Sequence, residues 1–279
     1  MNFVQRLQTI QRRNNSLLCI GLDTDLARIP KFLQKYSNPQ YEFNRRIIDE
    51  TKDLVCAYKL NLAFYETIGE DGWSTVHRTL DYIPKEIVTI GDGKRGDISS
   101  SAEWQARLFY EDWNFSASTV SPYMGRDSIE PFIRRNDRCA FVLAVTSNKG
   151  SKDFQYLKVG GKLLYEHVVR KAIEWNAKKN IGLVAGATHP KDLHRIRSLA
   201  PEMPILVPGI GAQRGNLEAA VRYGCDKNGE LAIINVGRSV IYTSTDEDFA
   251  EKAREAATDY RDQINRHREK YFEREKLNA

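Results

Sequence analysis

Clustered cysteines, abundant histidine and long apolar runs are all missing from this chain of 279 residues. Its four cysteines are far apart, and no CxxC pair or Cys/His cluster indicates a zinc site. We expect them to be reduced and buried, which favours a cytoplasmic protein because disulfides persist in oxidising compartments. No apolar stretch reaches 18 residues, so we expect no transmembrane span. The histidines fall beside helix-like stretches or in the tail, where we expect surface positions: His77, His167, His189, His194 and His267.

The sequence also lacks the signatures of several function classes. Like charges never run to five in a row, and no basic module is interleaved with aromatics, so we expect no nucleic-acid binding. No Ser/His/Asp motif, P-loop or GxGxxG follows a strand, which argues against acyl transfer, nucleoside-triphosphate chemistry and dinucleotide redox chemistry. The formal net charge of +5, with both signs mixed along the chain, favours a small anionic substrate.

Eight short, β-rich apolar runs are present, and helix-like stretches separate most of them. The runs are continuous and not alternating, as expected for parallel strands that are covered on both faces. Together with a length near the roughly 250 residues typical of such barrels, this predicts one α/β domain over 1–279, a closed (β/α)₈ TIM barrel. An open doubly wound sheet is the alternative. The runs begin at Leu17, Cys56, Ile87, Ala117, Ala140, Ile181, Pro204 and Ala232.

Three further segments flank or interrupt this pattern. Residues 1–16 predict a short amphipathic helix without the continuous apolar core of a signal peptide, and its apolar side carries Phe3, Val4, Leu7 and Ile10. Residues 246–279 carry mixed charges at helical spacing and predict a closing helix on the outside of the barrel. Residues 146–161 are polar with three glycines. They form either a mobile lid or an ordinary surface excursion.

The sharpest motif is GDGKRGDI, residues 91–98, where two acids and a lysine crowd together at the end of an apolar strand. If the strand continues, Asp92 and Lys94 point to the same face, although a local ion pair finishing the strand is the simpler reading. Lys59 ends the preceding strand and Asp23 ends the first. In a barrel these four groups meet at one rim, where flanking carboxylates keep each lysine protonated.

A second motif pair follows the seventh and eighth strands: PGIGAQRG at 208–215 and INVGRS at 234–239. Barrels commonly bind phosphate there through backbone N–H groups of glycine-rich loops and nearby helix N-termini. The amide of Gln213 and the guanidinium fork of Arg238 suit phosphate oxygens. PGIG alone would be an ordinary turn. The expected contacts are Pro208, Gln213, Gly237 and Arg238.

Six motifs in order resemble the orotidine-5′-phosphate decarboxylase family, in particular its longer bacterial branch. They are GLDTD, YKLNLAFYE, GDGKRGDI, VTSNKGS, VPGIGAQ and NVGRSVIY, and they span about Leu17 to Tyr242. The resemblance implies decarboxylation of orotidine 5′-monophosphate to uridine 5′-monophosphate, the last step of de novo pyrimidine nucleotide synthesis, without cofactor or metal. It also implies no nucleic-acid or membrane partner.

The resemblance also implies residue roles. The catalytic residues would be Lys94, as proton donor, with Asp92, Asp97 and Lys59. Asp23 would contact the ribose, Gln213 and Arg238 the phosphate, and Ile98 the substrate. Either Ser147 or Asn148 would face the pyrimidine, and the sequence leaves that choice open. Family members are homodimers, which implies that Asp97 enters the partner's site.

The residue types suit this chemistry. Loss of CO₂ from C6 of the pyrimidine leaves a carbanion without an ordinary electron sink, so the site must supply a fixed positive charge and then a proton. Two other readings remain. One is a sugar-phosphate aldolase or isomerase, in which Lys94 forms a Schiff base or Asp92 binds a metal. The other is an inactive barrel that binds phosphorylated ligands or nucleic acid.

Overall fold

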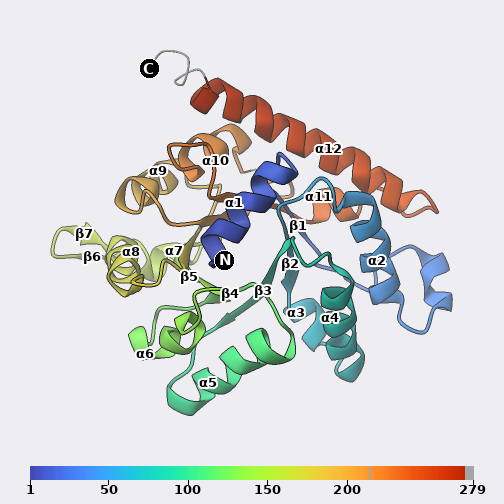
Figure 1. Cartoon of the computed structure of the whole chain (residues 1–279), viewed down its shortest axis with the longest axis horizontal. Helices are drawn as coiled ribbons and strands as arrows, with labels where there is room; N and C mark the ends of the chain where they lie inside the picture. The colour runs from blue at the N-terminus through green and yellow to red at the C-terminus, as the bar shows by residue number, and fades with distance from the viewer. Residues whose placement is uncertain (214, 274–279) are drawn as a thin grey trace.

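A computed structural model describes residues 1–213 and 215–273 of the chain. Eight parallel strands close into a barrel in the order β1-β10-β9-β8-β5-β4-β3-β2, with helices outside it (Figure 1). The predicted barrel and all eight predicted strands are confirmed. Their bounds are β1 Leu18–Gly21, β2 Ala57–Asn61, β3 Val88–Arg95, β4 Ala117–Val120, β5 Cys139–Val145, β8 Ile181–Ala185, β9 Ile205–Val207 and β10 Ala232–Val236.

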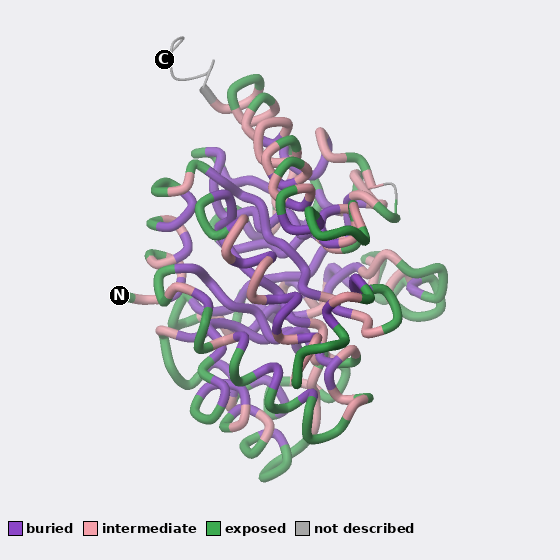
Figure 2. The backbone as a smooth tube through the Cα atoms, turned by 90° about the vertical axis from the view of Figure 1, so that its right-hand side faces the viewer, coloured by how far each residue is buried: buried purple, intermediate pink, exposed green. Residues whose placement is uncertain are grey.

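The strands form the buried centre of the molecule, and exposed segments lie around them (Figure 2). The longer covering helices are α2 Pro39–Thr51, α4 Glu70–Tyr82, α5 Ser99–Arg107, α8 Leu164–Trp175, α9 Pro190–Leu199 and α10 Leu217–Gly224. Short helical turns are η1 Lys31–Lys35, α3 Ala63–Glu66, η2 Leu108–Asp112, α6 Arg126–Ile129 and η3 Glu130–Ile133. Helix α4 was not predicted, because the face it buries consists of small and polar residues apart from one valine: Gly72, Thr75, Val76 and Thr79.

Helix α1 (Phe3–Arg13) covers the amino-terminal ends of the strands, in front of the barrel in Figure 1. The ring of Phe3 meets that of Phe141 edge to face at 6.0 Å between centroids. The buried Gln11 donates from Nε2 to the carbonyl of Ala232, the first residue of β10, at 2.8 Å. The predicted amphipathic helix is therefore confirmed, and the structure adds that it covers one end of the barrel.

Helix α12 (Phe249–Arg268), extended by η4 (Glu269–Glu273), packs outside the barrel against α2, α10 and α11 (Arg238–Ile241) (Figure 1). This confirms the predicted closing helix up to residue 273, and residues 274–279 of that prediction lie outside the described part. Among the described residues, no helix has the length and apolarity needed to cross a membrane.

The excursion after β5 has more regular structure than its sequence predicted. It contains α7 (Ser151–Phe154) and an antiparallel hairpin of β6 (Lys158–Val159) and β7 (Lys162–Leu163). Large apolar side chains, those of Phe154 and Val159, are exposed on it. Whether it moves as a lid stays a prediction.

Candidate active site

A cavity of about 390 Å³ opens at the carboxyl ends of the barrel strands. Barrel enzymes place their chemistry at this end, because loops from every strand converge there. The sequence-predicted residues that line it are Asp23, Lys59, Asp92, Lys94, Ser147, Asn148, Pro208, Gln213, Gly237 and Arg238. These residues come from six of the eight strands or the loops after them, and Thr119 of β4 and Val184 of β8 line the same cavity.

Four charged side chains form a hydrogen-bonded chain of alternating sign on one wall. Lys59 Nζ lies 3.3 Å from Asp23 Oδ1 and 2.9 Å from Asp92 Oδ2. Lys94 Nζ lies 2.7 Å from the other oxygen of Asp92, Oδ1. We call Asp23, Lys59, Asp92 and Lys94 the charged array.

Burial and the attraction between opposite charges shift the pKa values of Lys59 and Asp92 in opposite directions, and the attraction has the larger effect. Burial by itself would lower the pKa of Lys59, yet the charges of Asp23 and Asp92 raise that pKa above its ordinary value. Burial likewise opposes ionisation of Asp92, but Lys59 and Lys94 hold its pKa below the ordinary range. Both buried groups are therefore ionised at neutral pH. The Lys94 side chain is 50% exposed and forms the open end of the array.

The backbone at this wall departs from a regular strand. The pairing of β3 with β4 shifts register between Gly91 and Arg95, and Lys94 has a positive φ of 46°. Strand β3 nevertheless continues to Arg95, and both Asp92 and Lys94 line the cavity. Thr119 of β4 also lines the cavity, and its hydroxyl donates to Asp92 at 2.8 Å. Thr119 was not predicted as a site residue, because its surroundings in the sequence indicate only a strand.

Asp23 is held by a tyrosine from the other end of the barrel sequence. Tyr242 donates from its hydroxyl to the Asp23 carbonyl at 3.1 Å and accepts from the Asp25 backbone N–H at 2.7 Å. Burial raises the pKa of Tyr242 to about 12, which keeps this donor protonated. The guanidinium of Arg28 stacks 4.0 Å from the ring centroid. Tyr242 and Arg28 were not predicted, since only the fold brings Tyr242 to the loop after β1 that contains Arg28.

The glycine-rich loops after β9 and β10 pack tightly against each other. Gly211 has a φ of 82°, and a Cβ there would lie 1.9 Å from Ser239 Oγ. Only glycine fits this approach. Gln213 and Arg238 are exposed beside these loops and line the cavity together. The loops thus present an amide and a guanidinium to the same space.

The opposite wall comes from the loop after β5. The Gln155 side chain makes two hydrogen bonds to Thr146. Its Oε1 accepts from the Thr146 backbone N–H at 2.9 Å, and its Nε2 donates to the Thr146 hydroxyl at 2.8 Å. The Thr146 hydroxyl then donates to Asn148 Oδ1 at 2.6 Å, which leaves the Asn148 amide hydrogens for other acceptors. Ser147 lies between them at the cavity. The clamp by Gln155 was not predicted, because the partners are nine positions apart across an irregular loop.

Two predicted site residues lie outside the cavity. Asp97 follows β3 and accepts from the Ile98 backbone N–H at 2.8 Å, and Ile98 is 54% exposed. Other large apolar side chains are exposed on the segments after β3, β4 and β5: Trp104, Tyr123, Met124 and Phe154. Within one chain, Asp97 therefore does not join the charged array.

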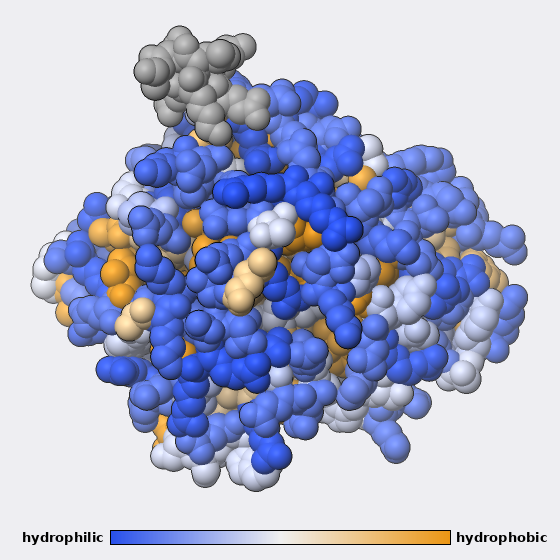
Figure 3. Space-filling view, in the orientation of Figure 1, coloured by the Kyte–Doolittle hydropathy of each residue, from blue (hydrophilic) through white to orange (hydrophobic). Residues whose placement is uncertain are grey.

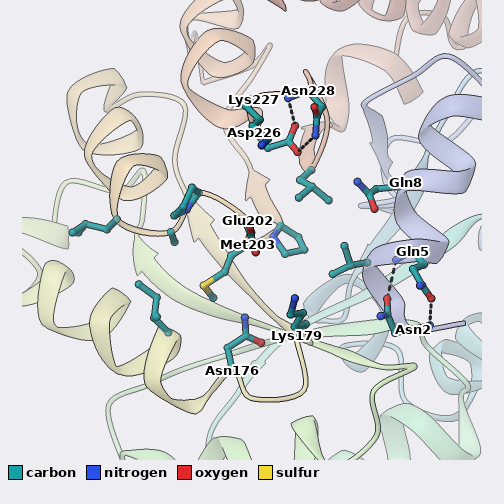
Figure 4. A pocket seen from close by; sticks show the side chains of 17 residues that line it. Asn2, Gln5, Gln8, Asn176, Lys179, Glu202, Met203, Asp226, Lys227 and Asn228 are labelled. Atoms are coloured by element: carbon teal, nitrogen blue, oxygen red, sulfur yellow. Dashed lines mark hydrogen bonds between the residues drawn. The ribbon is translucent and has the colours of Figure 1, made fainter.

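A larger cavity of about 650 Å³ lies at the other end of the barrel, between α1 and the loops before β8, β9 and β10 (Figure 4). Its polar groups largely bond to one another: Asn2 and Gln5 form the cap of α1, and Asp226 accepts from Asn228. The surrounding face is mostly hydrophilic (Figure 3). Nothing there matches the charged array, so the smaller cavity is the candidate active site.

The donor set of the candidate site suits an anionic organic ligand. It offers two lysines, an arginine and four side-chain amides along with the two carboxylates. Among residues 1–213 and 215–273, no group of three or more histidine, cysteine, aspartate or glutamate side chains is arranged to hold a metal ion.

Comparison with known proteins gives one consistent result. The family model described as Orotidine 5′-phosphate decarboxylase / HUMPS family matches residues 16–255. The orotidine 5′-phosphate decarboxylase of Dehalococcoides mccartyi is 46% identical over 97% of this chain and 100% of its own length. That of Roseiflexus castenholzii is 46% identical over 95% of this chain and 98% of its own. The solved structure of Leishmania donovani OMP decarboxylase superposes with a TM-score of 0.84 at 39% identity, covering 96% and 99% of the two chains.

Proposed function

The chain belongs to the orotidine 5′-phosphate decarboxylase / HUMPS family, and on this basis we propose that it is an orotidine 5′-phosphate decarboxylase. This carboxy-lyase converts orotidine 5′-monophosphate to uridine 5′-monophosphate, the last step of de novo pyrimidine nucleotide synthesis. The observation that carries the proposal beyond family membership is the charged array, set in one cavity with Gln213 and Arg238.

Lys94 has the central role in the proposed reaction. The bond from C6 to the carboxylate breaks, its electron pair stays on C6, and CO₂ leaves. The ammonium of Lys94 stabilises the developing negative charge and then transfers a proton from Nζ to C6, after which water reprotonates the amine. Its position at the open end of the array, 2.7 Å from Asp92, supports this role. No cofactor or metal takes part in this step.

Asp92 and Lys59 preorganise the charge. Asp92 accepts from both lysines, and Lys59 is almost fully buried between Asp92 and Asp23. Because these groups are fixed before substrate arrives, little reorganisation is needed when charge develops at C6. Asp23 at the end of the array would accept a hydrogen bond from a ribose hydroxyl.

The remaining residues would hold the rest of the nucleotide. Gln213 and Arg238, with the backbone at Pro208 and Gly237, would bind the phosphate, and binding energy there would help to close the site. Either Ser147 or Asn148 would face the pyrimidine. The occupied Asn148 Oδ1 favours its amide N–H groups as donors to a pyrimidine carbonyl.

We further propose a homodimer in which Asp97 and Ile98 enter the partner's site. Their place outside the cavity of their own chain supports this, as do the exposed apolar side chains on the neighbouring segments. The four cysteines are free and buried, which suits a reducing compartment such as the cytoplasm.

Loss of orotidine 5′-monophosphate absorbance on addition of the purified, chelator-treated protein tests the reaction, with uridine 5′-monophosphate identified as product. Catalytic loss supports the proposal. No loss contradicts it and favours the sugar-phosphate alternative, for which borohydride trapping of a Schiff base on Lys94 is the assay. The buried carboxylate of Asp92 next to Lys94 argues against that alternative, because a Schiff-base lysine works best when partly deprotonated.

A further inference from the structure

One hydroxyl bridges the irregular end of β3. The pairing of β3 with β4 shifts between Gly91 and Arg95, so three residues of β3 stand opposite Thr119 alone. The strand ladder is interrupted there. Thr119 Oγ1 occupies the gap, lying 3.0 Å from the backbone nitrogen of Lys94 and 2.8 Å from Asp92 Oδ1.

The direction of both hydrogen bonds is fixed by the chemistry of the partners. The backbone N–H of Lys94 can only donate, so Thr119 Oγ1 accepts there. The ionised carboxylate of Asp92 can only accept, so it receives the single hydroxyl proton. Thr119 is 1% exposed, which keeps water from competing for either bond.

Both anchor points of the Lys94 side chain therefore depend on the same hydroxyl. Its backbone is held at a φ of 46°, which L residues seldom adopt. Its ammonium is held by Asp92 Oδ1, the oxygen that Thr119 also contacts. This side chain is 50% exposed, and among the described residues only the bond to Asp92 holds its ammonium away from solvent.

We propose that Thr119 is a positioning residue that keeps the Lys94 ammonium at the cavity by bonding to the Lys94 backbone and to Asp92. Its effect on turnover rests on the function proposed above. Its effect on the position of Lys94 is independent of any substrate.

Thr119→Val tests the inference, because it removes the hydroxyl at nearly constant shape, and Thr119→Ser restores it. We expect Thr119→Val to lower kcat by about tenfold or more with a smaller change in KM, as for loss of a hydrogen bond to a charged group. Thr119→Ser should recover most of that loss. Ser118→Ala is the matched control, since the neighbouring buried hydroxyl hydrogen-bonds to the Tyr110 hydroxyl at 2.7 Å and does not line the cavity. It should leave kcat unchanged.

A second readout follows Lys94 directly in the ligand-free protein. The rate of Lys94 acetylation by acetic anhydride, measured by peptide mass spectrometry against the other lysines, should rise several-fold in Thr119→Val and stay near wild type in Thr119→Ser. Unchanged kcat and labelling in Thr119→Val, or equal losses in the valine and serine variants, would overturn the proposal. If the wild type does not decarboxylate the nucleotide, the proposed function fails and the labelling alone decides the role of Thr119. Thr119→Ala replaces Thr119→Val if the latter does not fold.

Discussion

At the scale of single residues, the site depends on burying two opposite charges that compensate each other. Lys59 and Asp92 are both nearly inaccessible to solvent, and each remains ionised because of the other. Such pairs are costly to desolvate, and removing one partner leaves the other charge uncompensated. The array is therefore expected to serve the reaction more than the stability of the fold.

The pKa shifts of this pair predict how stability depends on pH. The pKa of Asp92 lies below its ordinary value of 3.8, so its ionised form contributes stability above that pH, which is lost as the pH falls toward the folded-state pKa. The pKa of Lys59 lies above 10.5, so its contribution is present below that pH and is lost as the pH rises through the folded-state pKa.

Urea unfolding between about pH 5 and pH 3 should therefore show wild type losing more stability than Asp92→Asn, by up to about 1.4 kcal/mol per pH unit below the ordinary pKa. Equal losses would mean that Asp92 is not stabilised as an anion in the folded state.

Arg238 gives a second prediction at this scale. Arg238→Ala should raise KM for orotidine 5′-monophosphate by about tenfold to a hundredfold, because charge-assisted bonds to a phosphate are lost. The nucleoside orotidine, which has no phosphate, is the control and should be turned over equally by both proteins. An unchanged KM for the nucleotide would place the phosphate elsewhere.

At the scale of elements, the sequence predicted regular structure well and irregular structure poorly. The eight strands were recognisable as continuous apolar runs. Helix α4 buries mainly small and polar residues, so its sequence shows no stripe of apolar residues at helical spacing. The bulge at Lys94 and the contacts of Thr119 and Gln155 depend on which residues of neighbouring elements stand opposite each other. Motif spacing along one chain does not contain that information.

The two glycine-rich loops carry an element-scale prediction. Gly211→Ala should destabilise the protein by about 1–3 kcal/mol and raise KM, because the added Cβ meets Ser239 and the φ of 82° disfavours alanine. The matched control is Gly229→Ala at the other end of the barrel, where φ is 74° and the nearest atom, in Phe272, lies at 3.2 Å. The control should lose stability without any change in KM. A normal KM for Gly211→Ala would show that these loops do not take part in substrate binding.

At the scale of the whole molecule, the barrel divides its tasks between its two ends. The end covered by α1 holds the larger cavity, whose polar groups largely bond to one another, and the other end gathers the charged residues. The sequence predicted this division, because polar and glycine-containing motifs follow the carboxyl ends of the strands. It also predicted a residue, Asp97, that the single chain leaves outside the cavity.

The proposed sharing of each site between two subunits leads to a prediction about assembly. Lys94→Ala and Asp97→Ala should each be inactive alone, yet mixing them with subunit exchange should restore about a quarter of wild-type activity, since half the dimers are mixed and each has one intact site. Absence of recovery, with exchange verified by mass spectrometry, would show that each site is complete within one chain.

The most direct test of the account is turnover of orotidine 5′-monophosphate by Lys94→Ala, measured together with calorimetric binding of uridine 5′-monophosphate. The account predicts that turnover falls by about 10³-fold or more, as for loss of both a proton donor and a preorganised charge, while product binding remains measurable. A variant that retains near-normal turnover would contradict the assignment of Lys94 and the mechanism built on the charged array.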